Sequence, residues 1–194
     1  LDGSTGFRLD GVDASDYSGR SVSSAGDVNG DGFGDVIISA DEGDPDGKTN
    51  AGESYVVFGK ASGWGASLDL SSLDGNNGFR LDGVDALDYS GYSVSNAGDM
   101  NADGYDDVII GAFFASPDGK SDAGESYVVF GKSSGFSADI DLSSLNGSNG
   151  FRLDGVDGGD YSGGSVSSAG DVNGDGFNDI IIGAYYADPD GKYR

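Results

Sequence analysis

The 194-residue chain contains no cysteine and no histidine. Disulfides, thiolate zinc sites, cysteine nucleophiles and imidazole bases are therefore excluded. Basic residues are scarce, since 10 Lys and Arg stand against 34 Asp and Glu, and the formal net charge is -24. A surface of that charge repels nucleic acid and anionic lipid and attracts cations. We therefore expect no nucleic-acid partner.

Long apolar runs are also missing. No run approaches the roughly 20 residues of a membrane-spanning helix, so we expect no membrane insertion. The apolar residues instead form short runs such as DVIISA and ESYVVFG, which are rich in Val, Ile, Tyr and Phe. Gly, Asp, Asn or Ser residues bound each run. Short runs of this kind are typical of β-strands, and the sequence predicts an all-β fold.

The sequence repeats with a period of 72 residues. The segment GFRLDGVD recurs with its phenylalanine at Phe7, Phe79 and Phe151. A fixed period of this length is typical of repeat architectures, in which each unit buries its faces against its neighbours. Because Leu1 already lies inside a repeat, we expect the chain to be a segment of a longer array.

Each repeat contains about four predicted strands, which indicates β-propeller blades of four antiparallel strands. In the second repeat we place these strands near 91–98, 107–113, 125–131 and 150–155, with a small extra turn at 142–145 and its counterpart at 70–73. Residues 1–194 then form one array, a partial propeller: the last strand of a preceding blade at 6–11, a blade at 17–83, a blade at 89–155, and the first half of a third blade at 161–194. A closed ring needs about four to eight blades. We therefore expect the partners to include other blades of the same array or other copies of the chain.

An acidic nine-residue loop recurs in each repeat, as DVNGDGFGD (27–35), DMNADGYDD (99–107) and DVNGDGFND (171–179). Positions 1, 3, 5 and 9 carry side-chain oxygens, position 6 is a glycine suited to a sharp turn, and position 7 supplies a backbone carbonyl. The candidate ligands, loop by loop, are Asp27, Asn29, Asp31, Phe33 and Asp35; Asp99, Asn101, Asp103, Tyr105 and Asp107; and Asp171, Asn173, Asp175, Phe177 and Asp179. Ca²⁺ prefers six to eight flexible oxygen ligands, whereas Mg²⁺ demands near-ideal octahedral geometry. The pattern predicts three Ca²⁺ sites.

Two other kinds of loop share part of this pattern. An EF-hand needs a bidentate glutamate at position 12 and flanking helices, but position 12 is Ile38, Ile110 or Ile182, inside a predicted strand. A metal-free turn built from Asp and Asn side chains is the other alternative. The same oxygen pattern recurs in all three loops, which favours calcium.

These motifs resemble the FG-GAP repeats of integrin α-subunit β-propellers, and within that family the bacterial tandem FG-GAP repeat proteins. The acidic pattern is followed by an apolar strand that ends in Gly-Ala, at 111–112 and 183–184, and in Ser-Ala at 39–40. Tyr-Ser-Gly stands in the Phe-Gly position of each repeat, beginning at Tyr17, Tyr89 and Tyr161. The resemblance implies a seven-bladed ring, a secreted or cell-surface location and a role in adhesion or recognition.

Loop geometry suggests where a ligand would bind. In a four-stranded meander, the turns between strands 1 and 2 lie on the side opposite the connections between strands 2 and 3. The acidic loops are turns of the first kind, and the long connections at 40–53 and 112–125 are of the second kind. Long loops on a rigid scaffold commonly form binding surfaces. We therefore expect a protein or glycan ligand on the side away from the calcium loops.

Catalysis is not expected of this chain. The notable acidic residues all occur in sets of three, whereas a catalytic site is normally singular. Two alternatives to an adhesion or recognition module remain, namely a mechanical spacer or filament-forming surface protein, and a non-catalytic part of a secreted hydrolase. The recurring Arg8, Arg80 and Arg152 are expected to pair with nearby carboxylates, and Trp64, which does not recur, to be an exposed loop residue outside the repeating frame.

Overall fold

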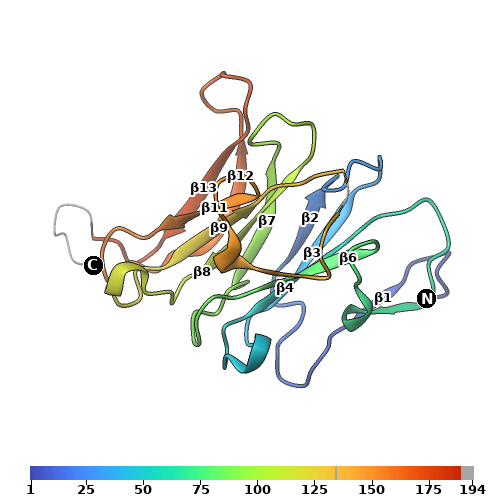
Figure 1. The fold of residues 1–194 in the computed structure, drawn as a ribbon, viewed down its shortest axis with the longest axis horizontal. Coiled ribbons are helices and arrows are strands. Elements are labelled where there is room, and N and C mark those ends of the chain that lie inside the picture. Colours follow the sequence, from blue (N-terminus) through green and yellow to red (C-terminus); the bar gives the residue numbers. More distant parts are fainter. Residues whose placement is uncertain (134, 189–194) are drawn as a thin grey trace.

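The apolar runs form the inner strands of repeated antiparallel sheets in the computed structural model, which describes residues 1–133 and 135–188. The described part of the chain contains β-strands and short 3-10 turns but no α-helix. The strands are β1 (Arg8–Asp10), β2 (Val22–Gly26), β3 (Asp35–Ala40), β4 (Glu53–Val57), β5 (Ser67–Asp69), β6 (Gly78–Asp82), β7 (Ser93–Gly98), β8 (Asp107–Ala112), β9 (Glu125–Val129), β10 (Asp139–Asp141), β11 (Gly150–Asp154), β12 (Ser162–Gly170) and β13 (Asp179–Ala184). The all-β prediction is therefore confirmed (Figure 1).

Two of the sheets have the strand order of a propeller blade. Strands β2, β3, β4 and β6 pair antiparallel in sequence order, and β7, β8, β9 and β11 do the same. We call these sheets blade 1 and blade 2, and the β12–β13 hairpin blade 3. The four strands predicted for the second repeat are all present, and the extra turns appear as the 3-10 turns η2 (Leu70–Ser72) and η4 (Leu142–Ser144). Residues 189–194, at the end of the third predicted blade, lie outside the described residues.

Two very short strands were not predicted. Strand β10 pairs parallel with β6, the outer strand of blade 1, and β5 pairs in the same way with β1. Each of the two segments has only three residues, Ser-Leu-Asp and Asp-Ile-Asp, which is too short for a pattern to be read. These pairings join the connection between strands 3 and 4 of one blade to the outer strand of the blade before it.

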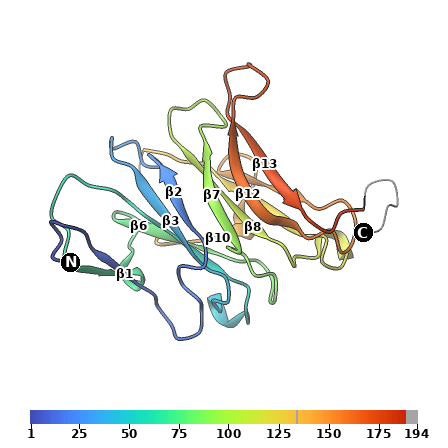
Figure 2. The same ribbon diagram turned by 180° about the vertical axis from the view of Figure 1, so that it is seen from behind.

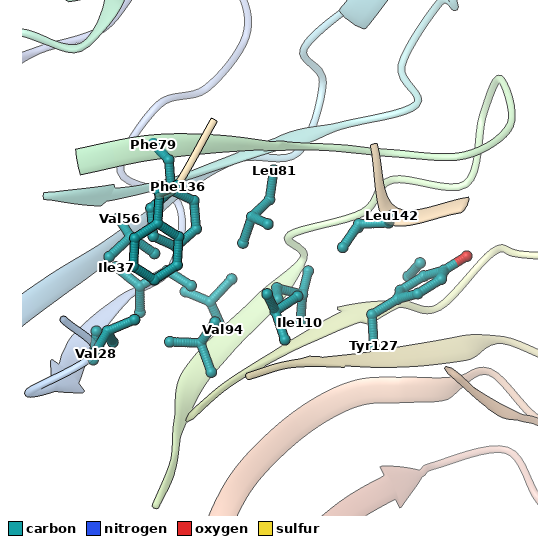
Figure 3. Close-up of a cluster of buried hydrophobic side chains, with 14 of the residues drawn as sticks. Val28, Ile37, Val56, Phe79, Leu81, Val94, Ile110, Tyr127, Phe136 and Leu142 are labelled. Carbon is teal, nitrogen blue, oxygen red and sulfur yellow. The ribbon is translucent and has the colours of Figure 1, made fainter. Parts of the chain in front are cut away.

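The core lies mainly between blades. One cluster of buried side chains joins Ile37, Val56 and Phe79 of blade 1 to Val94 and Ile110 of blade 2 (Figure 3). A second cluster joins blade 2 to blade 3. Strands β4, β8 and β9 are buried along their whole length, as expected for strands that are covered on both faces. Most of the buried apolar side chains in these clusters therefore lie where neighbouring blades meet.

Trp64 belongs to the repeating frame, so the prediction of an exposed loop residue was wrong. Its ring is half-buried and stacks on Phe7, with centroids 4.1 Å apart and planes at 7°. One repeat later, Phe136 stacks on Phe79 in the same way, at 4.5 Å and 4°. Both copies of this position carry an aromatic ring, and the change from Trp to Phe hid the equivalence.

The connections between the strands of a blade lie on two opposite sides of the molecule. Figures 1 and 2 show the tips of the β2–β3, β7–β8 and β12–β13 hairpins projecting on one side. The connections that carry η1 (Pro45–Gly47) and η3 (Pro117–Gly119) lie on the opposite side. Among the described residues, no helix has the length and apolar character needed to cross a membrane.

We predict that Phe79→Ala destabilises the chain far more than Phe7→Ala. Phe79 is fully buried between blades 1 and 2, whereas Phe7 is only half-buried. Removing a buried phenyl ring costs about 3–5 kcal/mol, and the loss at Phe7 should be less than half of that. Urea unfolding of both variants measures the difference, and equal losses would contradict a core built between blades.

Candidate metal centres

The acidic loops are the tips of the hairpins formed by strands 1 and 2 of each blade. A β-bulge precedes each tip, between Ser24 and Gly26 in blade 1 and at the equivalent positions of the other two blades. Gly26 has φ of +81° at the bulge, a conformation that glycine adopts without steric cost. The Ala-Gly pair before the first aspartate of each loop thus bends the hairpin into its tip.

The side chains at positions 1, 3 and 5 organise the loop through backbone amides. The Asp31 N–H donates to Asp27 Oδ1 at 3.0 Å and to Asn29 Oδ1 at 2.9 Å. The Gly32 N–H donates to Asp27 Oδ2, and the Phe33 N–H donates to Asp31 Oδ1, both at 2.9 Å. The oxygens of all three side chains therefore face the inside of a single turn.

The other two loops repeat this arrangement. In the second loop, the amides of Asp103, Gly104 and Tyr105 donate to the side chains of Asp99, Asn101 and Asp103 at 2.9–3.1 Å. In the third loop, the amides of Asp175, Gly176 and Phe177 donate to Asp171, Asn173 and Asp175 at 2.8–3.1 Å. The structure thus brings positions 1, 3 and 5 together in every copy.

The aspartate at position 9 has a different environment. Asp35 is buried and accepts N–H bonds from Val28 at 2.9 Å and from Gly59 at 2.7 Å. It therefore links the acidic loop to the connection between strands 3 and 4 of its own blade. Asp107 does the same through Met100 and Gly131, each at 2.9 Å.

Burial raises the pKa of Asp35 to about 6, and the charges of Asp31 and Asp27 add to the rise. The pKa of Asp107 is raised to about 6 for the same reasons, with burial first and then Asp103 and Asp99. The third copy, Asp179, is less buried and accepts an N–H bond from Val172 at 2.8 Å. In the first two loops, the carboxylates at positions 1 and 5 therefore lie close enough to position 9 to oppose the ionisation of that aspartate.

The donor set fits a hard cation in chemistry, although the three carboxylates of a loop do not converge on one point. In residues 1–133 and 135–188, no group of three or more acidic side chains lies close enough to hold a metal ion. Each carboxylate oxygen has two lone pairs, so an oxygen that accepts one N–H bond keeps a lone pair for a cation. A bound Ca²⁺ would therefore require the three carboxylates of a loop to lie closer to one another.

Sequence reasoning missed Asp106, at position 8 of the second loop. Its carboxylate accepts the Asp27 N–H at 2.8 Å, and its own N–H donates to the Asp27 carbonyl at 3.2 Å. Asn178, at the same position of the third loop, donates its N–H to the Asp99 carbonyl at 3.3 Å. Position 8 is occupied by Gly34, Asp106 and Asn178, so a search for identical residues passes over it. These bonds connect the tips of neighbouring blades.

The recurring arginines pair with carboxylates, as expected. Arg80 lies 3.7 Å from Glu53 and 3.4 Å from Asp139, and it also pairs with Asp82. Arg152 pairs with Glu125 at 3.3 Å and with Asp154. Glu53 and Glu125 also accept hydrogen bonds from Tyr55 and Tyr127. We assign these groups to the scaffold, since they tie the third and fourth strands of each blade together.

A hollow of about 560 Å³ is lined in part by the connection that carries η3, which lies on the side opposite the acidic loops. It is lined by Asp85, Ala86, Leu87, Asp88, Tyr89, Phe114, Ser116, Asp122 and Glu125. Asp88 is buried in its wall, and burial raises the pKa of this carboxyl to about 7, with the charges of Glu125 and Asp85 adding to the effect. The hollow thus combines aromatic rings with several carboxylates.

Comparison with known proteins identifies the repeat. The model of the FG-GAP repeat matches residues 18–57, 90–129 and 162–194, which together make up more than half of the chain. Integrin alpha-4 of Xenopus laevis is 30% identical over 186 residues, and Integrin alpha-PS5 of Drosophila melanogaster is 32% identical over 188 residues. These alignments cover 94% and 95% of this chain but only 16% of each integrin.

Phosphatidylinositol-glycan-specific phospholipase D of Bos taurus is 30% identical over 168 residues, which is 87% of this chain and 19% of that protein. The chain therefore spans less than a fifth of the length of these curated relatives. The matched segments begin at the Ser-Gly of each Tyr-Ser-Gly motif, and the first two of them end within the third strand of a blade. The chain belongs to the FG-GAP repeat family and is similar to the integrin α-subunits.

Proposed function

We propose that the chain is part of an extracellular, calcium-binding β-propeller that serves adhesion or recognition. The observation that carries this proposal is the threefold recurrence of one oxygen-lined hairpin tip on a frame shared with integrin α-subunits. A secreted or cell-surface location is part of the proposal and is supported by the similarity to integrins. The chain itself is proposed to be non-catalytic.

Calcium is the ligand proposed for the three tips. Each loop offers three carboxylates, one amide oxygen and one backbone carbonyl, and Ca²⁺ accepts oxygens of all these kinds. The bound ion would supply positive charge among carboxylates that otherwise repel one another. The residues at positions 1, 3 and 5 would hold it at the tip, and Asp35, Asp107 and Asp179 would connect it to the hairpin base. We propose that the role is structural, namely stabilisation of the hairpin between strands 1 and 2.

The opposite side of the molecule is where we propose that a protein or glycan ligand binds. The hollow beside Tyr89 and Phe114 supports this, because aromatic faces and carboxylates together suit recognition of polar ligands that also have apolar faces. Phe114 packs edge-on against Tyr161, and Tyr161 stacks on Tyr185, so the aromatic surface extends into blade 3. A rigid scaffold with the ligand on one side and the ions on the other keeps the two roles apart.

One relative favours a second candidate function. The similar segment in Bos taurus is part of a protein whose name, phospholipase D, denotes a hydrolase. The chain could thus be the non-catalytic part of a secreted hydrolase, binding the surface on which a separate catalytic domain acts. A mechanical spacer or filament-forming surface protein is the third candidate.

We predict that removal of calcium lowers the melting temperature. A site filled at 100 times its dissociation constant adds about 2.7 kcal/mol to the folded state, and a chelator removes that contribution. Asp103→Asn should reduce the number of Ca²⁺ ions bound per chain, as measured by titration calorimetry, from three to two. Asp118→Asn, which makes the same charge change in an exposed turn on the opposite side, is the control and should keep three. An unchanged melting temperature with chelator would contradict a structural role for calcium.

We predict that one class of ligand binds saturably when the chain is applied to glycan and protein arrays. Tyr89→Ala should weaken that binding at least tenfold, because it removes an aromatic wall of the hollow. Tyr105→Ala, which alters an acidic loop, is the matched control and should bind normally in the presence of Ca²⁺. A spacer would show no saturable ligand on either array.

We predict that Asp88→Asn stabilises the chain at pH 8 and has little effect below pH 4. The folded-state pKa of Asp88 is about 7, above the ordinary 3.8, so the stability of the native chain falls as pH rises between these values. The variant lacks this loss and should be more stable at pH 8 by on the order of 2 kcal/mol, since one pKa unit corresponds to roughly 1.4 kcal/mol. Urea unfolding at both pH values gives the result, with the exposed Asp157→Asn as control. A variant less stable than the native chain at pH 8 would show that ionised Asp88 has a stabilising partner.

A further inference from the structure

Asparagine precedes glycine at five places, namely Asn29-Gly30, Asn77-Gly78, Asn146-Gly147, Asn149-Gly150 and Asn173-Gly174. In such a pair the backbone nitrogen of the glycine can attack Cγ of the asparagine side chain, because glycine has no Cβ to obstruct the approach. The reaction needs Cγ beside that nitrogen, an N–H that is not held in a hydrogen bond, and access to water. These requirements separate the five pairs.

The side chain of Asn29 folds forward across the Gly30 peptide. Its Oδ1 accepts the Asp31 N–H at 2.9 Å, and its Nδ2 donates to Asp31 Oδ2 at 3.1 Å. The ring that the first bond closes contains both Cγ of Asn29 and the nitrogen of Gly30, so the two atoms that must join lie in one tight turn. The N–H bond to Oδ1 also stabilises the negative charge that develops on this oxygen as the nitrogen adds to Cγ.

The Gly30 amide is free for this attack. Within residues 1–133 and 135–188, the Gly30 N–H donates no hydrogen bond, and Gly30 is exposed to solvent. Packing requires glycine here, since a Cβ on Gly30 would clash with the ring of Tyr105 in blade 2. The contact between neighbouring tips therefore keeps the reactive pair in place.

Two of the other pairs have a glycine amide that is already bonded. The Gly147 N–H donates to the Gly150 carbonyl at 2.8 Å, and the Gly174 N–H donates to Asp171 Oδ1 at 2.7 Å. Each bond must break before the nitrogen can attack, which slows the reaction at Asn146 and Asn173.

The remaining two pairs lie at the start of a strand. Gly78 and Gly150 are buried as the first residues of β6 and β11. Both ends of the Asn77 and Asn149 side chains are hydrogen-bonded to residues of the preceding loop. Their Cγ atoms are therefore held by the loop before the pair, and water is kept from the glycine.

The second acidic loop supplies a comparison within the same chain. Asn101 is held as Asn29 is, with Oδ1 accepting the Asp103 N–H at 2.9 Å and Nδ2 donating to Asp103 Oδ2 at 3.0 Å. The next residue is Ala102, whose methyl group obstructs the approach of its nitrogen to Cγ. The two loops thus share the fold of the turn and differ in the residue that must attack.

We propose that Asn29 is a site of spontaneous deamidation in the folded chain, with water as the only co-reactant. The Gly30 nitrogen forms a bond to Cγ, the Cγ–Nδ2 bond breaks, and Nδ2 leaves as ammonia with the proton that the Gly30 nitrogen loses. Water then opens the cyclic imide. Cleavage of its bond to Cγ gives aspartate, cleavage of its bond to the backbone carbonyl carbon gives isoaspartate, and nothing is oxidised or reduced.

The modification changes the tip of blade 1. In the aspartate product a carboxylate replaces the amide that donates to Asp31, so positions 1, 3, 5 and 9 are all acidic. A consequence for calcium rests on the proposed function, because the charge of the ligands tunes Ca²⁺ affinity. Asn29→Asp should therefore bind Ca²⁺ more tightly than the native chain in titration calorimetry, and an equal affinity would contradict the calcium site at this tip.

Mass spectrometry of the native chain, kept folded in mildly basic buffer with a chelator, tests the deamidation itself. Trypsin releases residues 21–48, in which Asn29 is the only asparagine, and residues 81–120, which contain Asn101. Asn29 should react at least about tenfold faster than Asn101, a barrier difference of about 1.4 kcal/mol, and should give two acidic products of equal mass. The chelator keeps the tips free of metal, so this result does not depend on the proposed calcium site.

Ala102→Gly is the decisive variant. Ala102 has φ of +57°, which glycine adopts without steric cost, so the fold should be kept and Asn101 should now react about as fast as Asn29. Ala61→Gly, at an exposed alanine that follows a lysine, is the control and should change neither rate. An Asn29 that stays intact or reacts no faster than Asn101 in the native chain would overturn the proposal, as would an Asn101 unaffected by Ala102→Gly.

Discussion

Burial of one blade's face against the next is the interaction on which the rest of this structure depends. A sheet of four short strands has two apolar faces and cannot cover either by itself. Ile37 and Val56 of blade 1 become fully buried only because Val94 and Ile110 of blade 2 lie against them. The VII and VVF runs are apolar at successive positions for this reason, as both sides of each inner strand need a cover. This packing accounts for the 72-residue repeat of the sequence, because every blade presents the same two surfaces to its neighbours.

This packing also fixes the positions of the acidic tips. Once the blades are stacked, their first hairpins point to one side and the tips come into contact, through Asp106 and the backbone of Asp27. Asp35 and Asp107 then link each tip to the connection between strands 3 and 4 of its own blade. The tips are therefore a connected row, in which neighbouring tips are hydrogen-bonded to each other and the first two are hydrogen-bonded to their own sheets.

The fold could be predicted from the sequence where a pattern of residues was long and recurred in every repeat. The Val- and Ile-rich runs located the inner strands, and the pattern of Asp, Asn and Gly located the tips, with positions 1, 3 and 5 facing one turn as expected. Prediction failed where the repeat kept a physical property and not a residue. Trp64 and Phe136 serve the same stacking position with different rings. The Asp106 carboxylate accepts the Asp27 N–H, whereas the bond that Asn178 makes to Asp99 comes from its backbone N–H and Gly34 has no side chain. The strands β5 and β10 form only because an outer strand of the preceding blade lies beside them, which no local pattern encodes.

The proposed function has each oxygen-lined tip close around a calcium ion. A crystal structure of the 194-residue chain grown with Ca²⁺, with anomalous differences recorded at long wavelength, tests this most directly. We expect one anomalous peak at each of the three tips, about 2.3–2.6 Å from oxygens at positions 1, 3, 5, 7 and 9. Tips that keep only their backbone hydrogen bonds, with no peak in ample Ca²⁺, would contradict it.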